Sequence, residues 1–443
     1  MPRKIQLPRA GTPKEEVLKK MNALRARDAN WKDGRTWSLV YYAGEEIANL
    51  LKEAYALSLH ENGLSPLAFP SLRRFENEVV AMTAALLGGD EQVAGNMTSG
   101  GTESILLAVK TARDMARKER GVTAPEMVLP VTAHPAFEKA GRYFHVKPVR
   151  IPVDGDFRAD PEAARRAVTE NTILMVGSAP AYPHGTIDPI GELAAVAREK
   201  NICLHVDACL GGFLLPFLRK LGYPVPDFDF RVPGVTSLSA DVHKYGYAAK
   251  GASVILYRNR DIRKYQYTVV TDWPGGVYAS PTMPGTRPGG AIAAAWAILN
   301  YLGEEGYLRL AEKVMKTTGA LIAGINSIPG LYVLGRPAMS VFAFTSDELN
   351  VYALGSAMQA RGWHLDALQL PPCLHVMVTA AHENVVEAFL ADLREAVRET
   401  RESSQTEVPA GAAALYGMLG TITDRQMADE LVLALLDEIY TPD

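Results

Sequence analysis

Short apolar runs alternate with helical patterns between about residues 75 and 260, and this alternation constrains the fold more than any other feature of the chain. The apolar runs MVLPVTA, TILMVGSA, ICLHVDA and ASVILY each have the length of a strand. Between them, SILLAVKTARDMARKE and IGELAAVAREK space their apolar residues three and four apart, as amphipathic helices do. Such alternation is typical of a mostly parallel sheet with helices on its faces. The sequence therefore predicts an α/β domain that binds its ligand at the carboxyl ends of the strands.

The segments on either side of this region indicate two further units. KEEVLKKMNALRARD and GEEIANLLKEAYALSLH predict helices around an aromatic break, TWSLVYYAG, and make an arm over residues 1–74. A long Ala-rich helical stretch begins at Gly290 and has a break near Gly303 to Gly306. Strand and helix patterns then alternate again, with a polar link, RESSQTEVPAGAA, before the last helices. We expect a large ligand-binding domain over residues 75–315 and a small α+β domain over residues 316–443.

Composition argues against several classes of function. The balance of 46 basic and 50 acidic residues gives a net charge of -4, which offers no broad basic surface for nucleic acid. No apolar run reaches the roughly 18 to 20 residues of a membrane span, and MPRKIQLPRAGTPKEEVLKKM lacks the apolar core of a signal peptide. Cys203, Cys209 and Cys373 are odd in number and without CxxC spacing, which favours packing cysteines over a metal site or disulfides. These features predict a cytoplasmic protein with a small-molecule partner and no metal.

The motif NMTSGGTESILLAVK places a Gly-Gly turn directly before an amphipathic helix. Backbone N–H groups of Gly100 and Gly101, the hydroxyl of Thr102 and the helix dipole can converge there on one phosphate group. The segment lacks the lysine of a P-loop and the GxGxxG spacing, which disfavours a nucleotide. Because such turns also occur for purely structural reasons, the motif gains meaning only beside other residues.

Three further residues follow strand patterns and supply those other parts. Asp207 ends ICLHVDA, His134 lies in VTAHPAF, and Lys244 lies in DVHKYG. Alone, they have ordinary explanations as a turn cap, a core histidine and a surface lysine. Together with the Gly-Gly turn they match the needs of pyridoxal 5'-phosphate: a lysine kept near neutral by burial or by a neighbouring cation for the aldehyde carbon, a carboxylate for the pyridine nitrogen, and a flat ring for stacking.

Longer motifs resemble those of the sphingosine-1-phosphate lyases, from about Tyr42 to the C-terminus. They are TSGGTESILLA, HPAFEKA, APAYPHGTIDPI, VDACLGGF, DVHKYGYAAKG, GGVYASPTMPGTRPG and ALYGM. These lyases belong to the fold-type I pyridoxal phosphate enzymes, which also include the group II amino-acid decarboxylases. The resemblance implies an α/β, transferase-like fold and a homodimer whose active sites lie at the subunit interface. It also implies cleavage of sphingoid-base phosphates into a long-chain aldehyde and phosphoethanolamine.

The resemblance implies roles for individual residues. Lys244 is similar to the cofactor-linking lysine, Asp207 to the partner of the pyridine nitrogen, and His134 to the ring-stacking histidine. The cofactor-phosphate region is matched by Gly101, Thr102 and His243, and by Gly285 and Thr286 from the other subunit. The candidate proton-transfer groups beside the substrate are Lys250, Tyr182 and Tyr416.

The substrate is less well defined than the cofactor. Where the family reads Asn-Pro-Leu-His, this chain reads NGLS, so Ser65 stands in the place of the expected phosphate-binding histidine three residues after Asn62. We expect Lys250, and Tyr42 across the dimer, to contact the substrate phosphate. The start of the chain resembles the soluble bacterial form of the family. An amino-acid decarboxylase and a pyridoxal phosphate-binding protein without turnover remain as alternatives.

Overall fold

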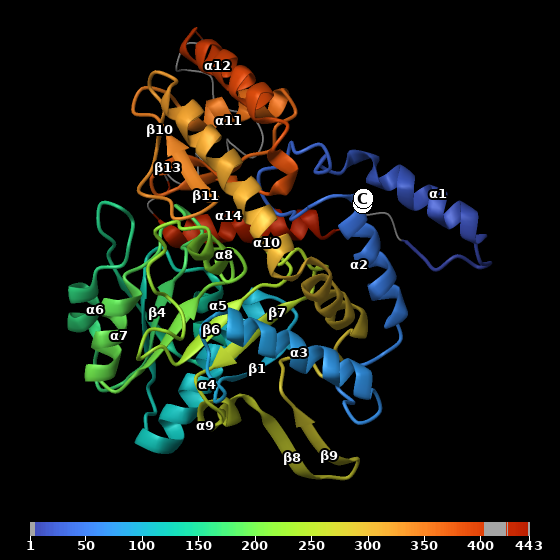
Figure 1. Ribbon diagram of the computed structural model, residues 1–443, viewed down its shortest axis with the longest axis vertical. Coiled ribbons are helices and arrows are strands. Elements are labelled where there is room, and N and C mark those ends of the chain that lie inside the picture. Colours follow the sequence, from blue (N-terminus) through green and yellow to red (C-terminus); the bar gives the residue numbers. More distant parts are fainter. Residues whose placement is uncertain (1–4, 403–421, 423, 442–443) are drawn as a thin grey trace.

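A seven-stranded sheet lies at the centre of the larger part of the molecule in the computed structural model, which describes residues 5–402, 422 and 424–441 (Figure 1). The strands lie in the order β1-β7-β6-β5-β4-β2-β3. β7 pairs antiparallel with both neighbours, and the remaining pairs are parallel, which confirms the predicted mostly parallel sheet. The strands are β1 (Ala94–Thr98), β2 (Glu126–Pro130), β3 (Lys147–Ile151), β4 (Thr172–Ser178), β5 (Cys203–Asp207), β6 (Ser237–Ala240) and β7 (Ser253–Tyr257).

Helices cover both faces of this sheet, and this explains the composition of its central strands. Every residue of β4, TILMVGS, is buried, as is every residue of β5, so neither strand alternates apolar with polar positions. The covering helices are α4 (Gly101–Arg120), α5 (Ala136–Phe144), α6 (Pro161–Ala167), α7 (Ile190–Glu199), α8 (Leu215–Lys220) and the short α9 (Arg260–Arg263). α4 begins at the Gly-Gly turn and ends at Gly121, whose left-handed φ of 70° suits a glycine at a helix C-terminus.

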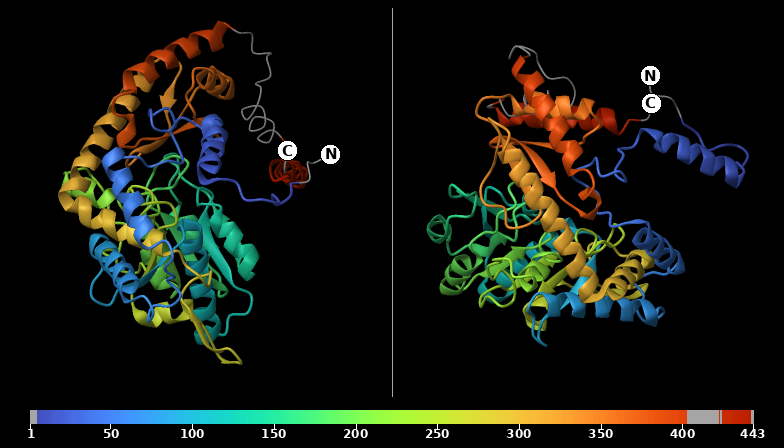
Figure 2. Two further views of the ribbon diagram at one scale, coloured as in Figure 1. Left: turned by 90° about the vertical axis from the view of Figure 1, so that its right-hand side faces the viewer. Right: turned by 45° about the horizontal axis from the view of Figure 1, so that its top comes forward.

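The N-terminal arm joins the two parts of the molecule. α2 (Glu45–Leu57) and α3 (Pro70–Leu86) pack against α10 (Gly289–Asn326), whereas no residue of α1 (Lys14–Leu24) is buried, and α1 projects from the molecule (Figure 2). The aromatic break enters the core of the small domain. There Trp37 is fully buried, stacks on His382 at 4.3 Å and pairs its backbone with residues 364 and 377.

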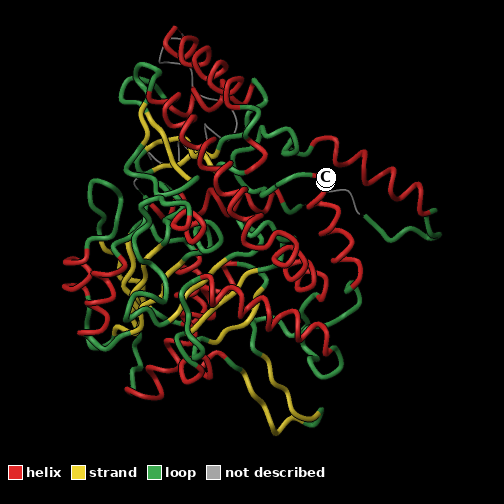
Figure 3. The backbone as a smooth tube through the Cα atoms, in the orientation of Figure 1, coloured by secondary structure: helices red, strands yellow, loops and turns green. Residues whose placement is uncertain are grey.

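The smaller part of the chain contains a four-stranded antiparallel sheet in the order β10-β11-β13-β12 (Figure 3). The long α10 leads into it, bends at Gly303, and contains the proposed boundary between residues 315 and 316. The sequence patterns predicted a strand, a helix, a strand and a helix here, but the first strand pattern, LYVLGRPAMSVFAFTS, contains two strands, and β12, which has no buried face, was missed. The elements are β10 (Tyr332–Val333), β11 (Val341–Thr345), α11 (Val351–Ala360), β12 (Asp366–Gln369), β13 (Pro372–Met377), α12 (Val386–Glu402) and α14 (Arg425–Ile439).

A two-stranded hairpin, β8 (Thr268–Trp273) and β9 (Gly276–Ser280), projects from the lower end of the molecule in Figure 1. Its apolar side chains Val269, Trp273 and Val277 are exposed. The polar link before the last helices lies outside the described residues. Within the described ranges, no helix combines the length and the hydropathy needed to cross a membrane.

Candidate active site

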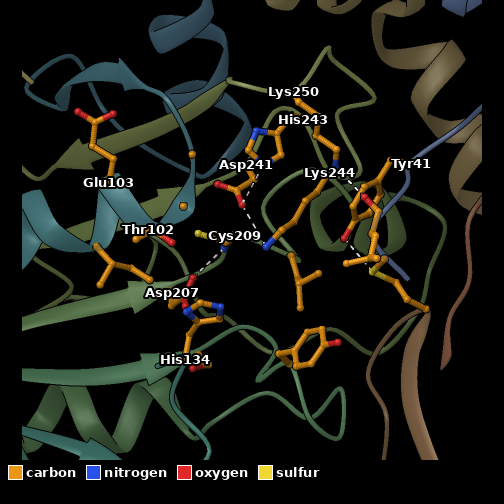
Figure 4. Close-up of a pocket in the computed structure, with 18 of the residues that line it drawn as sticks. Tyr41, Thr102, Glu103, His134, Asp207, Cys209, Asp241, His243, Lys244 and Lys250 are labelled. Carbon is orange, nitrogen blue, oxygen red and sulfur yellow. Dashed lines mark hydrogen bonds and ion pairs between the residues drawn. The ribbon is translucent and has the colours of Figure 1, made fainter. Parts of the chain in front are cut away.

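A cavity of about 490 Å³ lies at the carboxyl ends of the parallel strands (Figure 4). Residues at or just after the ends of β1, β2, β4, β5 and β6 all line this cavity. This is the position expected for a ligand in a sheet of this kind. These lining residues are Ser99, His134, Ser178, Asp207 and Asp241.

The Gly-Gly turn forms one end of this cavity. A side chain at Gly101 would place its Cβ 2.7 Å from the Sγ of Cys209 and 2.8 Å from Oδ2 of Asp241, so only glycine fits there. The Glu103 carboxylate accepts hydrogen bonds from the N–H and hydroxyl of Ser99, both at 2.7 Å, and this fixes the turn. Since the first N–H groups of α4 have no partner within the helix, they can bind a phosphate group together with the hydroxyl of Thr102.

Asp207 and His134 lie next to each other in the cavity (Figure 4). Oδ1 of Asp207 accepts hydrogen bonds from the N–H of Cys209 at 3.1 Å and the hydroxyl of Ser239 at 3.2 Å. Oδ2 has no partner among the described residues. Nδ1 of His134 accepts the N–H of Ala136 at 3.1 Å, and burial lowers the pKa of this imidazole, which keeps the ring neutral. A carboxylate oxygen and a neutral flat ring are therefore both available to a ring ligand.

Lys244 forms a buried ion pair that the sequence did not predict. Its Nζ lies 3.0 Å from Oδ2 of Asp241, three residues earlier in the chain. Burial is the largest influence on the pKa of Lys244 and would lower it, but the charges of Asp241, Cys209 and Asp207, with the hydrogen bond to Asp241, together raise this pKa above its ordinary value. Burial would likewise raise the pKa of Asp241, but the charges of Lys244 and His243, with hydrogen bonds from Ser253 and Lys244, together lower it. The expectation of a near-neutral lysine is wrong, because its neighbour is a carboxylate and not a cation.

His243 borders the phosphate end of the cavity. Its Nδ1 accepts the N–H of Ala252 at 3.1 Å, and its Nε2 lies 3.6 Å from Oδ2 of Asp241. A Cβ on Gly100 would lie 3.4 Å from Cε1 of this ring, so the imidazole packs directly against the turn. Burial lowers the pKa of His243 to about 4. A neutral ring with its N–H on Nε2 can donate a hydrogen bond here.

Lys250 and Tyr41 lie together at another part of the cavity wall. Nζ of Lys250 donates to the carbonyl of Leu39 at 2.9 Å and lies 5.0 Å from the centre of the Tyr41 ring. Burial, and then the charge of Lys244, lower the pKa of Lys250. The Tyr41 hydroxyl donates to Sδ of Met377 at 2.8 Å, and burial raises its pKa well above the ordinary value.

The sequence analysis named Tyr42 and missed Tyr41. Tyr42 donates its hydroxyl to Glu45 at 2.8 Å and packs on Trp31, away from the cavity of its own chain. A contact from Tyr42 across a dimer stays a prediction.

Tyr182 lines the cavity from the large domain and is held by the small domain. Its ring stacks on His375 of β13 with 4.2 Å between the ring centres. Its hydroxyl donates to Oδ2 of Asp366, on β12, at 3.0 Å. The sequence did not predict the part played by Asp366, because β12 has no distinctive apolar pattern.

The remaining predicted residues form a separate group outside the cavity. Oδ1 of Asn62 accepts the N–H of Arg287 at 3.1 Å, and its Nδ2 lies 3.4 Å from the hydroxyl of Thr286. Ser65 and Gly285 belong to the same two loops, and none of these four described residues lines the cavity. Tyr416 lies outside the described residues.

The cavity residues fit pyridoxal phosphate. The narrow glycine turn matches the phosphate, the unpartnered Oδ2 of Asp207 matches a protonated ring nitrogen, and Lys244 matches the aldehyde. Oδ1 of Asp241 is buried without a hydrogen-bond partner in the described part of the chain, so a hydrogen-bond acceptor remains available to a ligand beside Lys244.

Buried neutral histidines should make the protein sensitive to acid. Burial lowers the pKa to about 4 for His184, His205, His243, His375 and His382. Their ordinary value is about 6.5, so the unfolded chain binds more protons between these values. Their contribution to stability is therefore present above pH 6.5 and is lost as the pH falls through 4, by up to about 1.4 kcal/mol per pH unit for each histidine.

Asp188 and Asp229 act in the opposite direction, because burial raises the pKa of Asp188 to about 6 and also raises that of Asp229, so their contributions are lost as the pH rises. Two carboxyl groups do not offset five imidazoles. We expect the urea midpoint to fall steeply between pH 6.5 and 4, and a flat midpoint over this range would contradict the assignment of neutral buried rings.

Comparisons with known proteins agree with this geometry. The family described as the pyridoxal-dependent decarboxylase conserved domain matches residues 12–345. A sphingosine-1-phosphate lyase of Arabidopsis thaliana is 50% identical over 433 residues, which cover 96% of this chain and 79% of that protein. The sphingosine-1-phosphate lyase of Saccharomyces cerevisiae is 40% identical over 442 residues, which cover 98% of this chain and 75% of that protein.

Solved structures show the same relationship. The sphingosine-1-phosphate lyase of Burkholderia pseudomallei has a TM-score of 0.87 at 45% identity, over 90% of this chain and 93% of that chain. The glutamate decarboxylase of Lactobacillus brevis, with a TM-score of 0.79 at 20% identity over 91% of this chain and 96% of that chain, shares the fold. The chain therefore belongs to the sphingosine-1-phosphate lyase family of pyridoxal-dependent enzymes.

Proposed function

We propose that this chain is a pyridoxal 5'-phosphate-dependent carbon–carbon lyase, an aldehyde-lyase of sphingolipid metabolism. It cleaves phosphorylated long-chain amino alcohols such as sphingosine 1-phosphate to a fatty aldehyde and phosphoethanolamine. The observation that carries the proposal is the convergence of Lys244, Asp207, His134 and the Gly-Gly turn on one cavity, with Lys250 and Tyr41 on its wall. The free thiols of the three cysteines support a cytoplasmic location.

The cofactor part of the site follows from these positions. Bound pyridoxal phosphate supplies an electron sink for the negative charge left on the substrate Cα when its bond to Cβ breaks. Asp207 would hold the ring nitrogen, His134 would pack on the ring face, and Lys244 would bind the aldehyde carbon. The turn at Gly100 and Gly101, with Thr102 and His243, would hold the phosphate group.

The reaction needs one group to remove the proton of the β-hydroxyl and another to protonate Cα. Lys250 is suited to accept a proton, because burial and the charge of Lys244 lower its pKa. Tyr182 is suited to pass one on, because its hydroxyl already donates to the carboxylate of Asp366. Tyr416 remains a third candidate from the sequence alone.

A decarboxylase is the alternative, and it would need a cation for the substrate carboxylate. No arginine lines the cavity among the residues that the structure describes, so Lys250 would have to serve. The test is a panel of phosphorylated and free amino alcohols and amino acids, with aldehyde and carbon dioxide measured in parallel. Aldehyde from the phosphorylated amino alcohol supports the proposal, and carbon dioxide from an amino acid without aldehyde would refute it.

Lys250→Ala should separate substrate binding from cofactor binding. We propose that Lys250 contacts the substrate phosphate or its reacting end, and loss of one charge-assisted donor should lower kcat/KM for the phosphorylated substrate by about 10- to 100-fold. The cofactor spectrum should not change, because Lys244 is intact. Ser65→His should lower KM for the same substrate. Equal cleavage of phosphorylated and free amino alcohol by the wild type, unaffected by Lys250→Ala, would contradict this role.

A homodimer with shared sites is part of the proposal. The two loops that carry Asn62, Ser65, Gly285 and Thr286 lie together outside the cavity, where they are free to complete the site of a second copy. We expect that two inactive variants, Lys244→Ala and Gly285→Leu, regain partial activity when co-expressed, because the mixed dimer holds one intact site. Recovery would also justify testing Tyr42→Phe for a contact across the interface. A monomer with full activity would exclude shared sites.

A further inference from the structure

A hydrogen-bond network of buried polar side chains lies behind Asp207, on the side away from the cavity. It joins two neighbouring parallel strands, β5 and β6, whose register pairs His205 with Ser237 and Asp207 with Ser239. Because side chains alternate along a strand, these four lie on one face of the sheet. His205 and Ser239 have no exposed surface, and Ser237 and Asp207 are also buried.

The hydrogen-bond contacts within this network are continuous. Nδ1 of His205 lies 2.9 Å from the Ser237 hydroxyl, and its Nε2 lies 3.2 Å from the Ser239 hydroxyl. The Ser239 oxygen lies 3.2 Å from Oδ1 of Asp207 and receives the thiol of Cys209 at 3.3 Å. Every polar atom of the imidazole therefore has a partner, which is the condition for a stable buried polar network.

The number of available protons fixes the direction of these hydrogen bonds. An ionised carboxylate only accepts, so the single hydroxyl proton of Ser239 goes to Asp207. The Ser239 oxygen must then accept from Nε2–H of His205. Burial lowers the pKa of His205 to about 4, so the ring is neutral and carries only that one proton. Nδ1 is consequently an acceptor, and the Ser237 hydroxyl donates to it.

The series of donated hydrogen bonds runs toward Asp207 and ends on one oxygen of its carboxylate. The Ser239 hydroxyl and the Cys209 N–H both donate to Oδ1, and this orients the carboxylate while Oδ2 faces the cavity. Because burial keeps His205 neutral, this histidine adds no positive charge beside Asp207.

We propose that His205 and Ser239 are positioning residues, which hold the carboxylate of Asp207 aimed at the ring nitrogen of the cofactor. This inference rests on the cofactor part of the proposed function and is independent of the substrate. Ser239 acts directly on the carboxylate, and His205 fixes the single orientation in which the serine can do so. Ser237 fixes the tautomer of His205 and has the smallest effect.

The first test reads the tautomer directly. In holoprotein labelled with ¹⁵N-histidine, nine histidines are present, and the resonance missing from His205→Gln identifies His205. We expect a neutral ring protonated on Nε2 from pH 6 to 8. A ring protonated on Nδ1, or a cationic ring, would overturn the proposal whatever the variants do.

The second test follows the cofactor in variants of the chain. Ser239→Ala and His205→Leu should each weaken pyridoxal phosphate binding about tenfold, because a donor to a charged group is lost. They should also move the pH midpoint of the visible absorbance of the holoprotein upward by about half a unit or more. The absorbance midpoint shifts upward because the groups conjugated with the cofactor ring become more basic when the ring nitrogen holds its proton less tightly. His205→Gln, which keeps a donor near the position of Nε2, should restore both quantities to within about threefold of the wild type.

Thr111→Val is the matched control. It removes another buried hydroxyl pair, to the Tyr257 hydroxyl at 3.0 Å, between α4 and β7. It should lower stability without changing cofactor affinity or the absorbance midpoint. If Ser239→Ala and His205→Leu behave in the same way as Thr111→Val, the residues are merely structural and the proposal is wrong. Since neither readout uses a substrate, failure of the proposed reaction would leave this result unaffected.

Discussion

Lys244→Ala should reduce turnover by at least about 10³-fold, since it removes the amine that we expect to link the aldehyde of the cofactor. In the wild type, borohydride reduction should fix pyridoxal phosphate covalently to the peptide that carries Lys244. In the variant, the cofactor should bind without a covalent link and be lost on gel filtration. Peptide mapping checks the assignment, and an adduct on Lys250 in the wild type would overturn it.

This substitution also changes stability, and the ion pair predicts by how much. Lys244→Ala leaves the carboxylate of Asp241 buried without its partner at 3.0 Å, and breaking a buried pair in this way costs about 3–5 kcal/mol. Adding Asp241→Asn removes the unpaired charge and should recover most of this loss. The double variant should be stable and still inactive, which separates the loss of catalysis from unfolding. Recovery of turnover in the double variant would refute the role of Lys244.

Four strands of the large sheet, β2, β4, β5 and β7, were predictable from apolar runs that carry their own signal. Parallel strands covered on both faces are uninterrupted apolar runs, and β4 and β5 are buried at every position. β12 and the β8–β9 hairpin lack that signal, because β12 is half-buried throughout and β8 is exposed along its length. β1, AGNMT, is largely buried but is not an uninterrupted apolar run, so burial alone does not make a strand predictable.

The convergence of the predicted cofactor residues on one cavity was predictable for a related reason. Gly101, Asp207 and Lys244 follow strand ends, and the ends of parallel strands meet at one edge of the sheet. Residues that reach the cavity from other units give no such signal. Tyr41 and Asp366 come from the arm and from β12, and only the packing of the small domain on the large one brings them to the site. The charge of Lys244 could not be predicted either, because it depends on the 3.0 Å approach of Asp241.

Asp207→Asn should lower kcat by about 10²- to 10³-fold, the loss expected when one well-placed electrostatic group is removed. The fold should persist, because the asparagine carbonyl can still accept from the Cys209 N–H and the Ser239 hydroxyl. Its amide NH₂ would then face the cavity where Oδ2 now lies. A donor in that place cannot hold a protonated ring nitrogen, so the cofactor loses its capacity to stabilise negative charge on Cα. Circular dichroism and bound-cofactor content check that the variant is folded and loaded.

The Asp207→Asn variant also shows whether Ser239 affects kcat through Asp207. If the serine acts only by orienting the carboxylate of Asp207, Ser239→Ala should lower kcat in the wild type and have almost no further effect in Asp207→Asn. Residues that act through one another give such non-additive losses, whereas independent residues would multiply theirs. A loaded Asp207→Asn variant with near wild-type kcat would contradict the role of the carboxylate. Fully multiplicative losses would instead show that Ser239 reaches the reaction by a route other than Asp207.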